Sequence, residues 1–227
     1  MLHLGNNMKK KYILKILFIA FIVIIIIIFI LAYKFNMIPK VSYTASDFNI
    51  QVIKSGIDYD NDGIDDYTDI LEGAKIEALN KPRYKSKYYD GGYPPDNEGV
   101  CTDVIWRALE NAGYNLKELV DEDIKLNLNL YNAIDTPDPN IDFRRVRNLK
   151  VFFDNNYIDL TNDPSKINEW MPGDIVIFGA EHIAIISDKR NKDGIPYIIH
   201  NAGQPNRDED ALIYWYKTRG ITGHYRL

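Results

Sequence analysis

An uninterrupted apolar run over residues 16–33 constrains this chain more than any other feature of its sequence. Its length suits a hydrocarbon core about 30 Å thick, because an α-helix rises about 1.5 Å per residue. A helix in the core of a soluble protein would show a polar face, and this run has none. The run is also longer than the apolar stretch of a cleaved signal peptide, and no A-x-A-like site follows it. The sequence therefore predicts one uncleaved transmembrane helix.

The lysines before this run indicate its orientation. Lys9, Lys10 and Lys11 precede it, and basic residues gather on the cytoplasmic side of transmembrane helices. We therefore expect residues 1–37 to form a cytoplasmic stub and a single-pass anchor in the cell membrane. The rest of the chain is then extracytoplasmic. Either Met1 or Met8 can be the start of translation, since Met8 directly precedes the lysines.

Charge and cysteine content exclude several functions for the remaining chain. The whole sequence has 27 Lys and Arg against 32 Asp and Glu, and five lysines (Lys9, Lys10, Lys11, Lys15 and Lys34) lie in residues 1–37. The remainder thus has 22 basic and 32 acidic residues, a net charge near −10, so we expect no nucleic-acid partner. The one cysteine, Cys101, excludes an intrachain disulfide and a CxxC motif.

The pattern of apolar residues predicts an α+β fold with helices packed on an antiparallel β-sheet. Helices are expected at residues 42–56, 70–80, 101–112 and 116–124, where the spacing of apolar residues and the turn residues indicate them. Short β-branched runs at 174–178, 183–187 and 196–199 are typical of hairpin-linked strands. Helices followed by such strands favour α+β. Residues 38–69 are expected to be a linker helix and acidic loop, and 70–227 the main domain.

Cys101 and two histidines have the order of a cysteine hydrolase site. Cys101 opens the helix at 101–112, where the helix dipole favours a thiolate and is expected to lower the thiol pKa below about 8.5. His182 begins a predicted strand, and a hairpin turn near residues 191–192 places it opposite residues 200–202. The pattern therefore predicts a nucleophile, a base and an orienting group. Either His200 or Asn201 can be the orienting residue.

Several motifs in order resemble one bacterial family. They are Gly-Gly-Tyr-Pro-Pro at 91–95, Gly-Val-Cys-Thr-Asp-Val-Ile-Trp-Arg-Ala-Leu at 99–109, Asp-Pro-Asn-Ile-Asp-Phe-Arg-Arg-Val-Arg-Asn-Leu at 138–149, Trp-Met-Pro-Gly-Asp-Ile-Val at 170–176, His-Ile-Ala-Ile-Ile-Ser-Asp at 182–188 and Ile-His-Asn-Ala-Gly at 199–203. Residues 70–227 thereby resemble the family catalogued as domain of unknown function 1287, which is similar to papain-like, NlpC-type cell-wall peptidases. The resemblance implies a papain-like fold, with Cys101, His182 and His200 as the site. Thr102 departs from the serine that usually follows the nucleophile.

Residues 58–69 follow the pattern of a calcium-binding EF-hand loop. The candidate ligands are Asp58, Asp60 and Asp62 at positions one, three and five, Ile64 through its carbonyl at seven, Asp66 at nine and Asp69 at twelve. Gly63 stands at position six, where the loop turns sharply. Aspartate in place of glutamate at position twelve predicts a modest affinity. We expect a structural Ca²⁺ here; the alternative is a solvated acidic turn.

Three arginines and a tyrosine are candidates for substrate binding. Arg144, Arg145 and Arg147 can clamp substrate carboxylates, or can pair with the protein's own acids around residues 138–142. Tyr93, with the tyrosines just before it, can wall the cleft beside the cysteine or pack internally.

The combined pattern predicts a cysteine peptidase or amidase with no cofactor for catalysis. Together with the resemblance and the membrane anchor, it points to peptidoglycan stem peptides as substrate. Two alternatives remain open at this stage. One is a binding module of the same fold that recognises wall peptides without cleaving them. The other is a zinc site made of Cys101, His182 and His200, since thiolate and imidazole suit zinc.

Overall fold

The structure, a computed structural model, describes residues 2–34, 36–38 and 40–227 and divides into two compact units, Met1–Lys40 and Val41–Leu227. The first unit contains helix α1 (Leu2–Lys34). Within it, Lys10–Tyr33 has a mean hydropathy of 3.5 and is long and apolar enough to cross a membrane. An N-terminal helix of the expected kind is thus present where the apolar run predicts one.

The second unit is built on a six-stranded antiparallel sheet with the order β3-β8-β4-β5-β6-β7. Its strands are β3 (Ile158–Asp159), β4 (Ile175–Phe178), β5 (His182–Arg190), β6 (Pro196–Ile199), β7 (Asp208–Glu209) and β8 (Ile221–Arg226). The three strands expected from the sequence are confirmed as β4, β5 and β6. The C-terminal strand β8 inserts beside β4, so the end of the chain lies inside the sheet.

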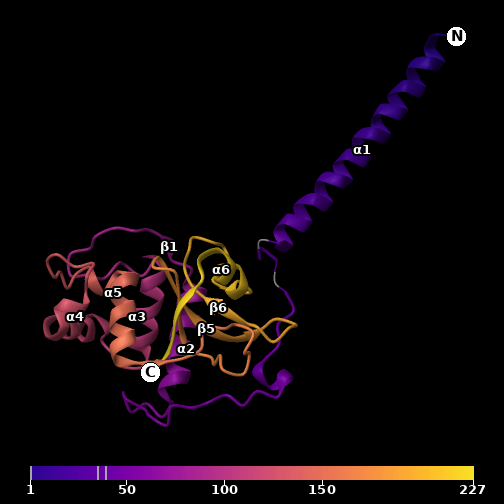
Figure 1. Cartoon of the computed structure of the whole chain (residues 1–227). Helices are drawn as coiled ribbons and strands as arrows, with labels where there is room; N and C mark the ends of the chain where they lie inside the picture. Colours follow the sequence, from indigo (N-terminus) through magenta and orange to yellow (C-terminus); the bar gives the residue numbers. More distant parts are fainter. Residues whose placement is uncertain (1, 35, 39) are drawn as a thin grey trace. The chain divides into compact units, whose positions relative to one another are not determined.

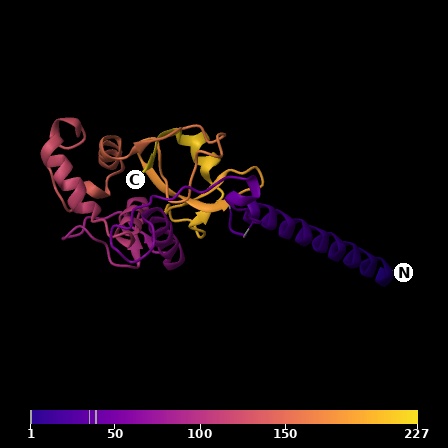
Figure 2. The same ribbon diagram turned by 90° about the horizontal axis from the view of Figure 1, so that it is seen from below.

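Helices cover both faces of this sheet, and alternate residues of the strands face them. Ile183 and Ile185 of β5 belong to the larger core, with the helices α2 (Asp66–Asn80), α3 (Cys101–Asn111), α4 (Leu116–Asn127) and α5 (Val146–Asn156). Ala184 and Ile186 belong to a second core with α6 (Leu212–Arg219). Figures 1 and 2 show α2 and α3 on one side of the strands and α6 on the other. Both faces are buried, which explains why the strands are continuous apolar runs.

The helix that carries Cys101 is the centre of the larger core. The apolar stripe expected at 101–112 is confirmed, since Val104, Ile105, Ala108 and Leu109 are all buried. α3 lies against α2 so closely that a Cβ atom on Gly73 would lie 2.6 Å from the Cβ of Asn111. This contact fixes α3 between α2 and β5 and therefore fixes where its N-terminus lies.

The remaining elements are short and lie mostly in the loops around these helices. They are η1 (Ala45–Phe48), the two-stranded parallel pair β1 (Arg83–Tyr84) and β2 (Glu98–Gly99), η2 (Leu128–Leu130) and η3 (Asp142–Arg144). The prediction of a helix over residues 42–56 is wrong in extent, because only the short helix η1 forms there. Thr44 caps η1 by bonding the Asp47 carboxylate, and Asn49 ends it in the left-handed region with φ 56°. The helix expected from residue 70 begins earlier, at Asp66, inside the acidic loop.

Candidate active site around Cys101 and His182

Cys101 is the first residue of α3 and is 6% exposed. The paired residues of β5 and β6 nearest the start of β5 are Ile185 and Ile199. Beyond them, the backbone N–H of Ile183 is directed at the Cys101 sulfur. The backbone N–H groups of Thr102 and Cys101 itself also face the sulfur. The fold therefore seats the thiol between the start of α3 and the start of β5, one residue from His182.

Asp103 holds the start of α3 in this position. Its carboxylate is fully buried and accepts the Val100 N–H at 2.7 Å, which caps the helix, and the Trp106 indole N–H at 2.8 Å. Arg144 donates to both carboxylate oxygens, through Nε at 2.7 Å and Nη2 at 2.9 Å. A bidentate pair of this kind is strong and directional, so it ties the helix start to η3.

His182 begins a chain of hydrogen-bonded groups that ends on a carboxylate. His182 Nε2 lies 2.8 Å from His200 Nδ1, and His200 Nε2 lies 3.1 Å from Glu209 Oε1. All three side chains are at least nine-tenths buried. The hairpin brings the two histidines together because Ile185 pairs with Ile199, which puts His200 diagonal to His182 on the same face of the sheet. Glu209, on β7, is a member that the sequence analysis missed.

Two side chains contact His200 Nε2. Glu209 Oε1 and the Gln204 amide nitrogen both lie 3.1 Å from it. Where His200 Nε2 carries the hydrogen and donates to Glu209, Nδ1 of a neutral His200 accepts and His182 Nε2 is its donor. In that tautomer the lone pair of His182 lies on Nδ1, which is the nitrogen available as a base.

The indole ring of Trp215 on α6 packs against one face of the His182 ring. The two rings are stacked with centroids 3.9 Å apart and an interplanar angle of 12°. Stacking and the bond to His200 together hold the imidazole in one orientation. Among the described residues no hydrogen bond joins this ring to Cys101. Alternation along β5 puts the His182 ring on the α6 face with Ala184, whereas Cys101 belongs to the larger core with Ile183. Catalytic hydrogen bonds are often long or absent before substrate binds.

The resting site holds a neutral thiol and a neutral imidazole. Burial raises the pKa of Cys101 to about 11, against a smaller lowering by the Ile183 N–H. Burial, and then the neighbouring His200, lower the pKa of His182 to about 2. The sequence-based expectation of a lowered cysteine pKa is therefore wrong. Loss of water around the sulfur outweighs the helix terminus, because desolvation acts on the full charge of the thiolate and the dipole offers only partial charges.

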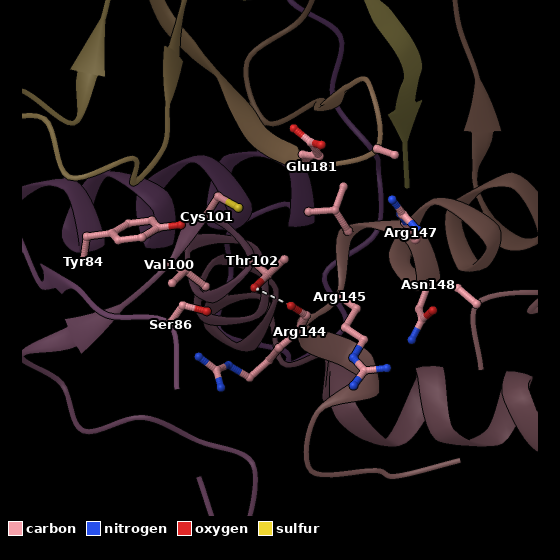
Figure 3. Close-up of a pocket in the computed structure, with 13 residues that line it drawn as sticks. Tyr84, Ser86, Val100, Cys101, Thr102, Arg144, Arg145, Arg147, Asn148 and Glu181 are labelled. Atoms are coloured by element: carbon pink, nitrogen blue, oxygen red, sulfur yellow. Dashed lines mark hydrogen bonds between the residues drawn. The ribbon is translucent and has the colours of Figure 1, made fainter. Parts of the chain in front are cut away.

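A pocket of about 370 Å³ opens beside Cys101. Figure 3 shows the cysteine sulfur facing the space between Glu181 and the segment 144–148. The lining residues are Tyr84, Ser86, Val100, Cys101, Thr102, Ala133, Arg144, Arg145, Val146, Arg147, Asn148, Ala180 and Glu181. This volume is in the range of small-molecule and peptide sites.

The three arginines have different roles in this pocket. The side chain of Arg144 is 2% exposed and its guanidinium binds Asp103 and the Lys87 carbonyl, so the expectation that it clamps substrate is corrected. Arg145 is half exposed, 4.0 Å from Asp142, and Arg147 is exposed with no ion pair among the described residues. Two cationic side chains thus remain at the pocket wall.

Tyr93 lies away from the pocket, which corrects its assignment to substrate binding. Its ring packs edge-on against Trp106 and Phe143, with centroids 4.8 and 5.4 Å apart, and its hydroxyl donates to Asn115 at 3.2 Å. Tyr84, which the sequence analysis did not single out, lines the pocket instead. Figure 3 shows its hydroxyl pointing toward Cys101, at the start of α3.

Asn201 is a scaffold residue, and His200 takes the place beside His182. The Asn201 amide donates to the carbonyl of Gly99 at 3.1 Å and of Pro82 at 3.3 Å. It therefore holds the strand β2 that leads into Cys101. This decides the alternative left open by the sequence, since hairpin register could not be read to a single residue.

The acidic loop forms a separate cluster away from Cys101. Carboxylate oxygens of Asp58, Asp60 and Asp62 lie within 4.8 Å of one another. Asp66 is turned away from them and bonds the Tyr59 N–H and the Tyr114 hydroxyl. Asp69 is buried in the first turn of α2. Burial, and then the charges of Asp62 and Asp60, raise the pKa of Asp69 to about 6.

Comparison with known proteins places most of the second unit in one family. The model of the Domain of unknown function (DUF1287) matches residues 71–227. This chain belongs to the DUF1287 family. The uncharacterized protein YijF of Escherichia coli (strain K12) is similar, with 39% identity over 169 residues that cover 69% of this chain and 80% of that protein. No solved structure matches.

The DUF1287 region contains the whole candidate site. Cys101, His182, His200 and Glu209 all lie within the matched residues, as does Arg144. The acidic loop at 58–69 and α1 lie before it. The family expected from the sequence motifs is confirmed.

Proposed function

We propose that this chain is a membrane-anchored cysteine hydrolase of papain-like type that cleaves amide bonds in peptidoglycan stem peptides outside the cytoplasm. The observation that carries the proposal is the buried chain of His182, His200 and Glu209, which begins at the start of β5, where the Ile183 backbone contacts the cysteine at the start of α3. A buried chain of polar groups that bond one another holds each ring in one orientation.

In the proposed reaction His182 Nδ1 takes the proton of Cys101 as the sulfur attacks the substrate carbonyl. The thiolate is not present at rest, so it forms only as this proton moves. The oxyanion of the tetrahedral intermediate is stabilised by backbone N–H groups at the start of α3. His182 then gives its proton to the leaving amine, and water hydrolyses the acyl-enzyme. His200 and Glu209 stabilise the imidazolium that exists between these two steps.

The pocket favours a substrate that carries carboxylates. Arg145 and Arg147 present two positive charges at its wall, while Glu181 on the opposite wall already faces Arg219 at 3.6 Å. The surrounding chain from residue 38 is strongly acidic, so these two arginines are a local exception. Stem peptides of peptidoglycan carry free carboxylates next to their amide bonds, and guanidinium groups bind carboxylates in a planar, bidentate manner.

The location of the site follows from the anchor in this proposal. The lysines before the apolar run of α1 keep the N-terminus in the cytoplasm, and the hydrolase domain is then outside. Protease added to intact spheroplasts should release the domain, because the whole chain after α1 is accessible. Full protection of the domain, under conditions where a known external protein is digested, would reverse the orientation.

The proposal is tested by incubating the purified full-length protein in detergent with peptidoglycan fragments and identifying the products by mass spectrometry. Cleavage at an amide bond is expected, and Cys101→Ser should abolish it, because an alcohol is a far weaker nucleophile than a thiol at the same position. The serine variant should melt like the wild type, since the side chains have similar size. Product formation that persists in the serine variant would rule out this nucleophile.

The same assay tests the pocket assignment. Fragments whose carboxylates are amidated should be cleaved with a higher KM, and a protein with Arg145→Gln and Arg147→Gln should no longer distinguish the two substrates. Lys192→Gln is the control. Lys192 is 80% exposed in the β5–β6 turn, so its substitution removes a positive charge at a place away from the pocket.

One observation favours a second candidate function. The thiol is buried and neutral, and within the described part of the chain no hydrogen bond joins it to His182. A binding module that holds wall peptides without cleaving them would have these properties. Fragments that bind to the wild type and remain intact over long incubation would establish that function. The zinc alternative lacks such support, because His182 Nε2 and His200 Nδ1 are bonded to each other.

A further inference from the structure

The loop at residues 58–64 is shaped around its own carboxylates. Asp58 accepts the N–H groups of Asp62 at 3.1 Å and Gly63 at 3.0 Å, and Asp62 accepts the Ile64 N–H at 2.8 Å. Asn61 and Gly63 have φ values of 64° and 98°, so the chain turns tightly. As a result three exposed carboxylates have oxygens within 4.8 Å of one another. Exposed acidic clusters of this kind are common, so the cluster alone assigns no ligand.

Asp69 supplies a second, independent observation. The residue is 2% exposed, and its Oδ2 atom is buried with no hydrogen-bond partner among the described residues. Its carbonyl accepts from Asn111 at the end of α3, and a Cβ atom on Gly113 would lie 2.8 Å from the Cβ of Asp60, so Asp69 and the loop meet at this end of α3. A buried carboxylate oxygen without a donor is costly. A cation between Asp69 and the loop would satisfy it.

Asp66 is excluded as a direct ligand by its own contacts. It is fully buried, with Oδ1 accepting the Tyr59 N–H at 2.9 Å and Oδ2 accepting the Tyr114 hydroxyl at 2.5 Å. Both oxygens are therefore committed to the protein. This changes the ligand set expected from the sequence pattern, in which Asp66 stands at position nine. In such loops that position commonly reaches the ion through a water molecule.

We propose that this loop binds one Ca²⁺ through the carboxylates of Asp58, Asp60, Asp62 and Asp69 and the carbonyl oxygen of Ile64, with water completing the shell. Hard oxygen ligands in a flexible loop are suited to calcium. Magnesium requires near-ideal octahedral geometry and keeps more of its water. The short Asp69 side chain places the affinity in the class of extracellular modules, with a Kd of about 10⁻⁴–10⁻³ M.

The loop is joined directly to the helix that carries Cys101. Tyr59 stacks on Tyr114, just after α3, with centroids 4.3 Å apart and an interplanar angle of 18°. Asn111, the last residue of α3, donates to the Asp69 carbonyl at 2.9 Å. A bound ion would therefore clamp the start of α2 and the end of α3 together. We infer that calcium stabilises the domain, and this inference does not depend on the proposed hydrolase activity.

The test measures thermal unfolding of the full-length protein in detergent, after removal of divalent ions with a chelator. Calcium at about 10 mM is roughly 10–100 times the expected Kd and should raise the Tm by roughly 5 °C through binding to the native state. Asp60→Asn with Asp62→Asn should lose this shift. Both residues are exposed, so the variant keeps its core. The matched control is Asp90→Asn with Asp96→Asn, two exposed acids in another loop, which should keep the full shift.

A second readout uses terbium as a luminescent substitute for calcium. Tyr59 lies in the loop and should sensitise terbium emission, and calcium should displace the ion. Asp69→Asn should weaken terbium binding at least about 10-fold, since it removes a charged ligand. The proposal is overturned if calcium leaves the wild-type Tm unchanged and terbium does not bind. Equal shifts from magnesium, or an unchanged shift in the loop variant, would also contradict it.

Discussion

Replacement of His182 by alanine is expected to lower kcat on peptidoglycan fragments by about 10³–10⁴-fold. The reason lies in the resting state of the site. Burial keeps Cys101 as a thiol with a pKa of about 11, so the thiolate depends on a base within the site. Without the imidazole neither the attack nor the protonation of the leaving amine is assisted. KM should change much less, because the ring is buried and does not line the pocket.

The residues behind His182 should have smaller effects of the same kind. His200→Ala and Glu209→Gln are expected to lower kcat by roughly 10- to 10²-fold, because they orient and stabilise the imidazole without carrying the transferred proton. Circular dichroism and the Tm of each variant control for folding. If His182→Ala retains kcat within a few fold of the wild type, the assignment of His182 as the base is wrong.

The pH profile of activity tests the lowered pKa of His182 in the folded protein. Its pKa is lowered to about 2, so the folded protein keeps a neutral base as pH falls from 7 to 5. The usual loss of activity near a histidine pKa of about 6.5 should therefore be absent. The unfolded chain does take up that proton, so the free energy of unfolding should fall below pH 6.5, by up to about 1.4 kcal/mol per pH unit. Rates must therefore be measured where the protein remains folded.

Replacement of Asp103 by alanine is expected to lower the free energy of unfolding by about 3–5 kcal/mol. The change leaves the guanidinium of Arg144 buried without its anion, and it removes the acceptor of the Trp106 indole and the Val100 N–H. For a chain of this length the Tm should fall by roughly 10 °C. Chemical denaturation monitored by tryptophan fluorescence measures the loss.

The chain offers a matched control for this ion pair. Asp121 pairs with Lys125 at 2.6 Å on the surface of α4, with the lysine 66% exposed, and Asp121→Ala should cost no more than about 0.5 kcal/mol. Arg144→Met combined with Asp103→Leu should recover much of the loss, because apolar groups of similar volume replace the buried charges. A loss below about 1 kcal/mol for Asp103→Ala would show that Arg144 finds another partner.

Much of the fold was readable from local patterns. The stripe of Ile105, Ala108 and Leu109 predicts α3 because one helix face recurs at a fixed spacing. Strands β4, β5 and β6 are apolar runs bounded by turn residues, and their hairpin follows from the short connection. Helix α5 was missed although Val146, Leu149 and Phe153 have helical spacing, whereas the missed elements α6 and β8 lack such a pattern. α6 buries only Leu212 fully, because its apolar and aromatic residues, 212–216, are consecutive and are not spaced at the period of a helix face.

The residues of the candidate site also differ in whether the sequence could predict them. Cys101 and the two histidines stand out as rare residue types at element boundaries. Glu209 does not, because nothing in its neighbourhood distinguishes it from the other acidic residues of the chain. Only the pairing of β7 with β6 brings it to His200. Arg144 likewise could not be assigned, because its partner Asp103 is 41 residues away and faces the same buried space only in the folded chain.

The sequence by itself determined an N-terminal apolar run long enough to span a membrane, the α+β class, the family and the position of Cys101 at a helix start, because each depends on local patterns in the chain. The tertiary structure alone decided the partner of His182, the pairing of Arg144 with Asp103, the position of Tyr93 outside the pocket, and the protonation of the thiol. These depend on which groups share a buried space and on how much water that space excludes. Desolvation raises the Cys101 pKa although the local sequence favours the opposite shift, since burial is a property of the whole fold.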